Sequence, residues 1–279
     1  MTRRFEHGGA FVLGAALVLA GAWPVAAQWG DGWYRRPPRF ATPKDLERGA
    51  FTFCRLHYTS VRSEALGHGW NTDYPNSDIN FMLRLSQLTR THVNLDREGA
   101  PNHVVVRATD DELFGCPFVF MSDVGTAGFD PLEVERLRDY LQAGGFLYVD
   151  DFWGDQAWEH WSRQIGKVLP PEQYPIVDIP LDHELFRALY RIEEVPQIPS
   201  IQHWYWSGGT TSERGWESEQ PHCRGIFDAN GRLMVVMTHN TDIADGWERE
   251  GDDEEFFSLF SVTKAYPMGI NIVLYAMTH

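Results

Sequence analysis

Apolar and polar positions alternate along the chain in a way that predicts helices followed by strands. The clearest example is the stretch from residue 131 to residue 149. Apolar side chains recur at helical spacing over residues 131–142, Asp130 and Glu133 have the spacing of a capping box, and Gly144 stands where a helix ends. Residues 146–149 are apolar throughout, as in a strand covered on both faces. This stretch therefore predicts a helix, a turn and a buried strand.

The same pattern predicts the rest of an α/β fold. Strands are expected at residues 51–58, 92–95, 103–106, 117–122, 146–149, 223–227 and 232–238, with a short one inside 170–180. Helices are expected to begin at Ser77, Asp155 and Pro267, to cover residues 110–114 and 181–190, and the last to turn Met277 inward. This alternation is typical of a mainly parallel sheet with helices on both faces, a three-layer sandwich. Residues 228–231 favour a C-terminal hairpin, and residues 193–222 lack a period and suggest a long loop or insertion.

The N-terminal residues differ from the rest. Residues 1–27 combine Arg3 and Arg4, an apolar run and the small residues Val25, Ala26 and Ala27, which is the pattern of a cleaved secretory signal peptide. An uncleaved membrane anchor is the alternative. Residues 28–48 are predicted to form an extended arm and residues 49–279 a single domain, with no later transmembrane span. We therefore expect an exported protein, periplasmic or extracellular.

Charge and cysteine content narrow the functional classes. The net charge of −15 argues against nucleic acid and anionic lipid as partners and favours neutral or cationic ligands. Cys54, Cys116 and Cys223 form no metal-ligand pattern, and at most one disulfide can join them. Buried free cysteines are the favoured interpretation, and the pairing stays open.

Three groups of polar residues are candidates for a site. The first is an acidic cluster at predicted strand ends, which could bind a divalent cation or act as acid and base: Asp123, Asp150, Asp151 and Asp155, with His239 and Asp242. The second is the loop 69–78, and the third is the aromatic run 203–206. Helix capping, turn formation and core packing are the alternatives for the three groups. The predicted ligand-binding residues are Arg55, Tyr58, Asn71, Asp73, Tyr74, Asp123, Asp150, Asp151, Trp153, His203, Trp204, His239 and Asn240.

Known catalytic motifs are missing from the sequence. There is no G-x-S-x-G turn, no glycine-rich phosphate loop after a strand and no H-E-x-x-H. Asp150, Asp151 and His239 are the catalytic candidates, and the sequence favours a protein that is not an enzyme. No cofactor is predicted, and a divalent metal is the one alternative.

Several blocks resemble the exported bacterial proteins described as domain of unknown function 4159. The matching residues are Phe53, Arg55, Leu56 and Tyr58; residues 70–75; Asp78, Asn80 and Phe81; residues 144–147 with Asp150 and Asp151; Asp182, His183, Leu185 and Phe186; and residues 269–271. The resemblance implies a class I glutamine amidotransferase-like, flavodoxin-like fold. It places His239 near that fold's histidine and gives the nucleophile turn no cysteine, since residues 150–153 read Asp-Asp-Phe-Trp. Genes of proteins that resemble this one often neighbour those of membrane-anchored von Willebrand A proteins and an associated ATPase, so the resemblance also implies an envelope protein complex.

Together these observations favour an exported, non-catalytic ligand-binding or protein-interaction domain of the cell envelope. The alternative is a metal-assisted hydrolase of an envelope glycan or peptide that uses Asp123, Asp150, Asp151 and His239. A purely structural partner subunit is a third possibility, and it predicts an exposed apolar patch without a deep pocket.

Overall fold

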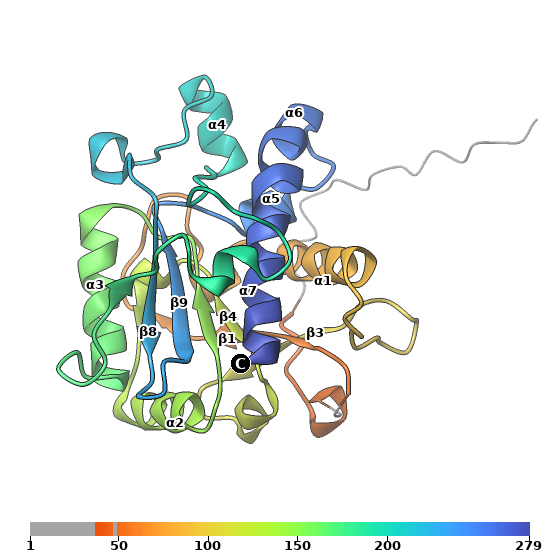
Figure 1. Ribbon diagram of the computed structural model, residues 1–279, viewed down its shortest axis with the longest axis vertical. Coiled ribbons are helices and arrows are strands. Elements are labelled where there is room, and N and C mark those ends of the chain that lie inside the picture. Colours follow the sequence, from red (N-terminus) through yellow and green to blue (C-terminus); the bar gives the residue numbers. More distant parts are fainter. Residues whose placement is uncertain (1–36, 47–48) are drawn as a thin grey trace, which may run out of the picture.

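A seven-stranded sheet forms the centre of the protein (Figure 1). The computed structural model describes residues 37–46 and 49–279, so the predicted signal peptide and most of the predicted arm lie outside the described residues. The strands follow the order β3-β1-β4-β6-β9-β8-β7 across the sheet. They are β1 (Phe53–His57), β3 (His103–Arg107), β4 (Val119–Met121), β6 (Leu147–Val149), β7 (Val177–Asp178), β8 (His222–Phe227) and β9 (Leu233–His239).

Strand directions confirm the predicted mainly parallel sheet. β3, β1, β4, β6 and β9 pair in parallel, and β8 joins β9 as an antiparallel hairpin that β7 extends. A second, two-stranded sheet pairs β2 (Thr59–Ser60) with β5 (Ala127–Gly128). The hairpin lies where the sequence predicts it.

Helices cover both faces of the sheet. The α-helices are α1 (Asn76–Leu88), α2 (Pro131–Gln142), α3 (Gly154–Val168), α4 (Ile201–Ser207), α5 (Asp245–Glu248), α6 (Glu254–Phe256) and α7 (Tyr266–Thr278). The 3₁₀ turns are η2 (Pro43–Leu46), η3 (Gly69–Asn71), η4 (Asp111–Gly115), η5 (Val124–Thr126), η6 (Glu184–Arg187) and η7 (Gly215–Ser218), and η8 (Phe257–Ala265) is a π-helix. No helix in the described ranges is long and apolar enough to cross a bilayer.

The alternation of side chains along each strand produces two cores. Phe53, Phe120 and Tyr148 point to the face covered by α1, α5 and α7, where they pack with Trp247. The intervening residues, such as Leu56, point to the opposite face, which α2 and α3 cover. Because successive residues of a strand face opposite sides, both cores come from the same short strands. The protein is therefore an α/β three-layer sandwich, as the sequence predicts.

The segment from α2 to β6 has the predicted geometry. Asp130 Oδ1 accepts hydrogen bonds from the backbone N–H groups of Leu132 and Glu133 at 2.8 and 2.9 Å, and Glu133 Oε2 accepts from the N–H of Asp130 at 2.9 Å. Gly144 adopts a φ of 108°, which only glycine reaches without strain. The capping box and the glycine stop are both present.

Two predicted helix caps are wrong. Helix α1 begins at Asn76, before Ser77, and the Ser77 hydroxyl accepts a hydrogen bond from Arg55 instead. Helix α3 begins at Gly154, before Asp155, and the Gly154 N–H donates to Asn240 Oδ1 at 2.8 Å. In each case the side chain that contacts the helix start comes from a residue distant in the sequence, Arg55 for α1 and Asn240 for α3.

Four other predicted elements differ in the structure. Residues 92–95 contribute isolated bridges at Val93 and Leu95 and no strand of the central sheet. Residues 181–190 form only the short turn η6, because the N–H groups of Leu189 and Tyr190 donate to Asn271 instead of continuing a helix. The segment 193–222 contains α4 and η7. Met277 is 44% exposed, so the last turn of α7 does not bury it.

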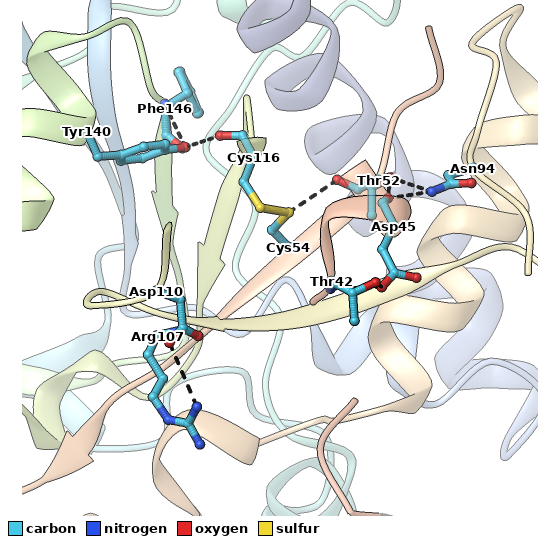
Figure 2. Close-up of a disulfide and its surroundings, with 10 residues drawn as sticks. All are labelled: Thr42, Asp45, Thr52, Cys54, Asn94, Arg107, Asp110, Cys116, Tyr140 and Phe146. Atoms are coloured by element: carbon cyan, nitrogen blue, oxygen red, sulfur yellow. Dashed lines mark hydrogen bonds and ion pairs between the residues drawn. A yellow bond between two sulfur atoms is a disulfide. The ribbon is translucent and has the colours of Figure 1, made fainter. Parts of the chain in front are cut away.

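One disulfide joins two of the three cysteines (Figure 2), which corrects the expectation of free cysteines. It links Cys54 in β1 to Cys116, at the end of η4, with a Cα–Cα distance of 6.1 Å. Both residues belong to the core beneath α2 and α3, whereas Cys223 is buried in the other core and stays free. The sheet therefore separates Cys223 from the pair.

We predict that the disulfide contributes to stability. Replacing both cysteines (Cys54→Ser with Cys116→Ser) should lower the free energy of unfolding by about 2–4 kcal/mol, because the bond restricts the unfolded chain. Denaturant unfolding measures this change, and mass spectrometry after thiol alkylation should show one free thiol in the unreduced wild type. Two or more free thiols, or an unchanged midpoint in the double variant, would contradict the prediction.

Candidate functional site

A cleft of about 730 Å³ lies at the carboxyl ends of the parallel strands. Loops that follow β1, β4, β6 and β9 contribute to it, together with α4, α5 and the segment before η7. Ligand sites of open α/β sheets lie in this position. The lining residues are Glu64, Ala65, Leu66, Gly67, His68, Asn71, Thr72, Asp73, Asp123, Asp151, Trp153, Ser200, Gln202, Glu213, Arg214, Asp242, Asp245, Glu248 and Arg249.

Three buried aspartates converge in this cleft. Asp73, Asp242 and Asp245 each offer a carboxylate oxygen, and these oxygens lie within 4.8 Å of one another. The three side chains come from the loop after β1, the loop after β9 and the start of α5. All three are at most 6% exposed. We call these three residues the aspartate triad.

Burial and mutual repulsion disfavour the ionised form of the triad. Burial raises the pKa of all three carboxyls, and that of Asp245 reaches about 7. The neighbouring carboxylates Asp151 and Asp73 raise the pKa of Asp242 further, whereas the guanidinium of Arg249 opposes the shift at Asp245. Bound protons or a bound cation would offset this repulsion.

Arg55 fixes the position of Asp73. Its guanidinium is fully buried and donates to both carboxylate oxygens of Asp78 in α1, with Nε distances of 3.0 and 3.1 Å. It also donates to the carbonyl oxygens of Trp70 and Thr72 at 3.2 and 2.9 Å. These bonds hold the loop that ends at Asp73, whose Oδ2 accepts from the Ser122 hydroxyl at 3.1 Å. Arg55 is a predicted ligand-binding residue, but in the structure it lies beneath the cleft and supports the loop that carries Asp73.

Asp123 and Asp151 also line the cleft, directly after their strands. Both have left-handed backbone conformations, with φ values of 51° and 55°, and Asp73 has a φ of 63°. Such strain in residues other than glycine concentrates at functional sites. Asp123 accepts a hydrogen bond from the Gly69 N–H at 2.7 Å, and burial raises its pKa to about 7. Burial and the neighbouring acids raise the pKa of Asp151, whose Oδ1 accepts from Trp153 Nε1 at 3.0 Å.

Two of the three catalytic candidates lie outside the lining of the cleft. Asp150 is fully buried below it and accepts hydrogen bonds from the Thr238 hydroxyl and, at 2.9 Å, from the Ala244 N–H. His239 stacks on Phe152, with 4.8 Å between the ring centroids, on the α3 side of the sheet. Burial lowers the pKa of His239 to about 3, so its imidazole is neutral at ordinary pH. The structure therefore does not bring Asp150 and His239 together with Asp123 and Asp151 in the cleft lining.

The other predicted ligand-binding residues divide into two groups. Asn71, Asp73, Asp123, Asp151 and Trp153 line the cleft.

The second group has structural contacts. Tyr58 donates to the carbonyl oxygens of Ser122 and Asp123, the Tyr74 hydroxyl accepts from a backbone N–H, and Asn240 caps α3. His203 contacts Thr210, and Trp204 packs on α6.

Sequence reasoning missed Asp245 and most of the rim. Asp242 and Asp245 are three residues apart where a strand passes into a helix, and the Asp245 N–H donates to Asp242 Oδ1 at 2.8 Å, the spacing of a residue that caps a helix start. That signal was present in the sequence. Four residues of the rim lie in the segment 193–222, which the sequence predicts only as a long loop or insertion, so no local pattern pointed to them. They are Ser200, Gln202, Glu213 and Arg214.

We predict that Arg55→Met destabilises the protein strongly. The substitution leaves Asp78 buried without its partner, which should lower the free energy of unfolding by about 3–5 kcal/mol. The double variant Arg55→Met with Asp78→Leu removes both charges and should recover a large part of the loss. Chemical denaturation measures both variants. A single variant as stable as wild type, or a double variant less stable than the single one, would show that the pair does not hold the loop.

Comparison with known proteins agrees with the resemblance seen in the sequence. A search of curated proteins finds no match. The family described as domain of unknown function (DUF4159) matches residues 52–277, which include every strand of the central sheet. The match covers the whole aspartate triad and the other acids of the cleft, and the chain belongs to the DUF4159 family.

Proposed function

We propose that the protein is an exported ligand-binding domain of the cell envelope and that its cleft binds a divalent cation through the aspartate triad. The supporting observation is the convergence of three buried carboxylates within 4.8 Å at the ligand-binding edge of the sheet. A doubly charged cation would offset the repulsion that raises the pKa of these groups.

The chemistry of the donors selects the class of metal. Asp73, Asp242 and Asp245 offer only carboxylate oxygens, which suit Ca²⁺, Mg²⁺ or Mn²⁺ better than Zn²⁺. Hydroxyl and amide groups of Ser200, Gln202 and Asn71 line the same cleft and can bind further polar groups of a ligand. Eight acidic side chains against two arginines in the lining favour a cationic or neutral ligand.

Two observations support export. Residues 1–27 have the pattern of a signal peptide, and the Cys54–Cys116 disulfide is of a kind that persists in oxidising compartments. The periplasm or the exterior also supplies Ca²⁺ and Mg²⁺ outside the buffered cytosol.

The proposal predicts a cation effect that depends on pH. Because the pKa of Asp245 is raised to about 7, this carboxyl stabilises the fold fully below the pKa of the unfolded state, and that stability is lost as the pH rises through the folded value. Ca²⁺, Mg²⁺ or Mn²⁺ should therefore raise Tm more at about pH 8 than at about pH 5, where protons compete for the triad. Thermal unfolding after chelation, with and without each cation, measures the difference.

Asp242→Asn supplies the variant for this experiment. It removes one charge of the triad while its amide oxygen can keep the hydrogen bond from the Asp245 N–H. We expect a higher Tm than wild type without cation at about pH 8 and at least a tenfold weaker cation affinity by calorimetry, or about 1.4 kcal/mol. The matched control is Asp139→Asn, an exposed acid on α2. Equal cation effects in wild type and Asp242→Asn would contradict the proposal.

A metal-assisted hydrolase of an envelope glycan or peptide is the second candidate. It draws on Asp123 and Asp151, which line the cleft with the triad. Burial raises the pKa of Asp123 to about 7, which suits proton transfer near neutral pH, and burial with the neighbouring acids raises the pKa of Asp151. The set of residues differs from the predicted one, since Asp150 and His239 lie outside the lining. A cation held by the triad would polarise the scissile group, and Asp123 or Asp151 would move the proton.

This candidate predicts turnover that depends on Asp151. If the protein hydrolyses peptidoglycan fragments, peptides or esters in the presence of Mn²⁺ or Mg²⁺, Asp151→Asn should lower kcat by roughly a hundredfold or more while Asp242→Asn lowers the affinity for the cation. Product release followed by mass spectrometry measures turnover. Cation binding without turnover of any of these substrates would leave the binding domain as the function and exclude the hydrolase for those classes.

A further inference from the structure

Helices α4 and α6 present aromatic and acidic side chains together at one end of the molecule. In Figure 1 both helices stand beyond the sheet, at the end opposite α2. On α4, Tyr205 is 54% exposed and Trp206 is 74% exposed. On the other segment, residues 252–255 read Asp-Asp-Glu-Glu, and Asp252, Glu254 and Glu255 are exposed. We call Tyr205, Trp206 and residues 252–255 the acidic–aromatic surface.

Contacts beneath this surface hold its two halves together. Trp204 packs edge-on against Phe256 at 5.7 Å between ring centroids and against Phe260 at 6.2 Å, so the buried side of α4 is fixed on α6 and η8. The Tyr205 hydroxyl donates to Asp253 Oδ2 at 2.9 Å, and Asp253 Oδ1 caps α6 by accepting from the Phe256 N–H at 2.7 Å. The exposed rings therefore belong to a helix that is already packed against its neighbours, and a partner would bind them with little further ordering.

The charge of this surface is one-sided. Residues 250–257 contain five carboxylates and no lysine or arginine, and α4 contains neither basic residue. The nearest arginine along the chain, Arg249, pairs with Asp245, Glu248 and Asp252 at the cleft side. Glu250 pairs with Arg84 and Asp252 with Arg249, whereas Glu254 and Glu255 are exposed and have no ion pair within the part of the chain that the structure describes. Exposed indole and phenol rings beside such carboxylates match the chemistry of a guanidinium or ammonium group, which can stack on a ring while it pairs with an acid.

We propose that the acidic–aromatic surface binds an arginine- and lysine-containing segment of a partner protein. Trp206 and Tyr205 would stack on the cationic side chains, and Glu254 and Glu255 would pair with them. Tryptophan, tyrosine and arginine are the residues that dominate protein–protein binding energy. Anionic lipid headgroups and nucleic acid would be repelled by the carboxylates, and a neutral glycan would leave their charge unmatched. Trp206, Glu254 and Glu255, the residues that the experiment changes, neither belong to the aspartate triad nor line the cleft.

The experiment uses the mature protein and a fluorescein-labelled peptide of alternating arginine and glycine, with fluorescence anisotropy as the readout. A peptide of alternating glutamate and glycine is the ligand control. We expect binding of the arginine peptide alone, weakening as salt rises from about 0.02 M to about 0.3 M. Trp206→Ala should weaken binding about fivefold or more, and Glu254→Lys with Glu255→Lys should abolish it.

Matched variants at the opposite end of the molecule test whether peptide binding depends on this surface or only on the negative charge of the whole protein. Phe114→Ala removes a 44%-exposed ring, and Glu135→Lys with Glu172→Lys reverses two exposed acids. Both should bind the peptide as wild type does, and circular dichroism should show every variant folded. The proposal is overturned if wild type does not bind the arginine peptide, or if the control variants lose as much affinity as the surface variants. It is also overturned if a neutral hexasaccharide binds through Trp206 and the arginine peptide does not.

Discussion

The buried ion pair between Arg55 and Asp78 is the constraint on which the site depends. Removing a guanidinium and a carboxylate from water is costly unless their hydrogen bonds are satisfied inside the protein. Here the guanidinium uses its donors on Asp78, the Ser77 hydroxyl and two backbone carbonyl oxygens of the loop after β1. The loop must therefore close around Arg55, and this closure delivers Asp73 to the cleft. A single strand residue thus links β1, α1 and the aspartate triad.

The cleft is lined by several carboxylates. Some have arginine partners: Glu64 pairs with Arg62, Glu213 with Arg214, and Asp245 of the triad with Arg249. In the triad, burial raises the pKa of each group, and neighbouring acids raise the pKa further, with Asp73 acting on both Asp242 and Asp245. An arrangement that lowers stability in the empty state is a common feature of binding sites. The disulfide, the Arg55–Asp78 pair and the two cores offset it elsewhere in the fold.

Much of the fold could be predicted from the sequence because the local signals agree with one another. The capping box at Asp130, the apolar period of α2 and the glycine stop all indicate the same helix, and the apolar strands indicate a covered sheet. The predictions failed where a distant residue satisfies a local group. Asn240 replaces the predicted Asp155 cap, and Asn271 ends the turn at η6. No pattern within a few residues contains that information. The amidotransferase-like relationship stays a prediction.

The site was predicted less well than the fold, because neighbouring residues of a strand point to opposite faces of the sheet. Along β9, Val236 belongs to one core and Met237 to the other, so the next two side chains, Thr238 and His239, also point in opposite directions. Thr238 meets Asp150 and Tyr148, and His239 therefore stacks behind the sheet, away from the aspartate triad. The sequence predicts that this strand ends at residue 238, and in the structure it ends at His239. A difference of one residue decides which face of the sheet a side chain occupies and therefore whether it enters the cleft. The acids in the turns after the strands do not depend on this alternation, and for that reason Asp123 and Asp151 lie where their positions in the sequence place them.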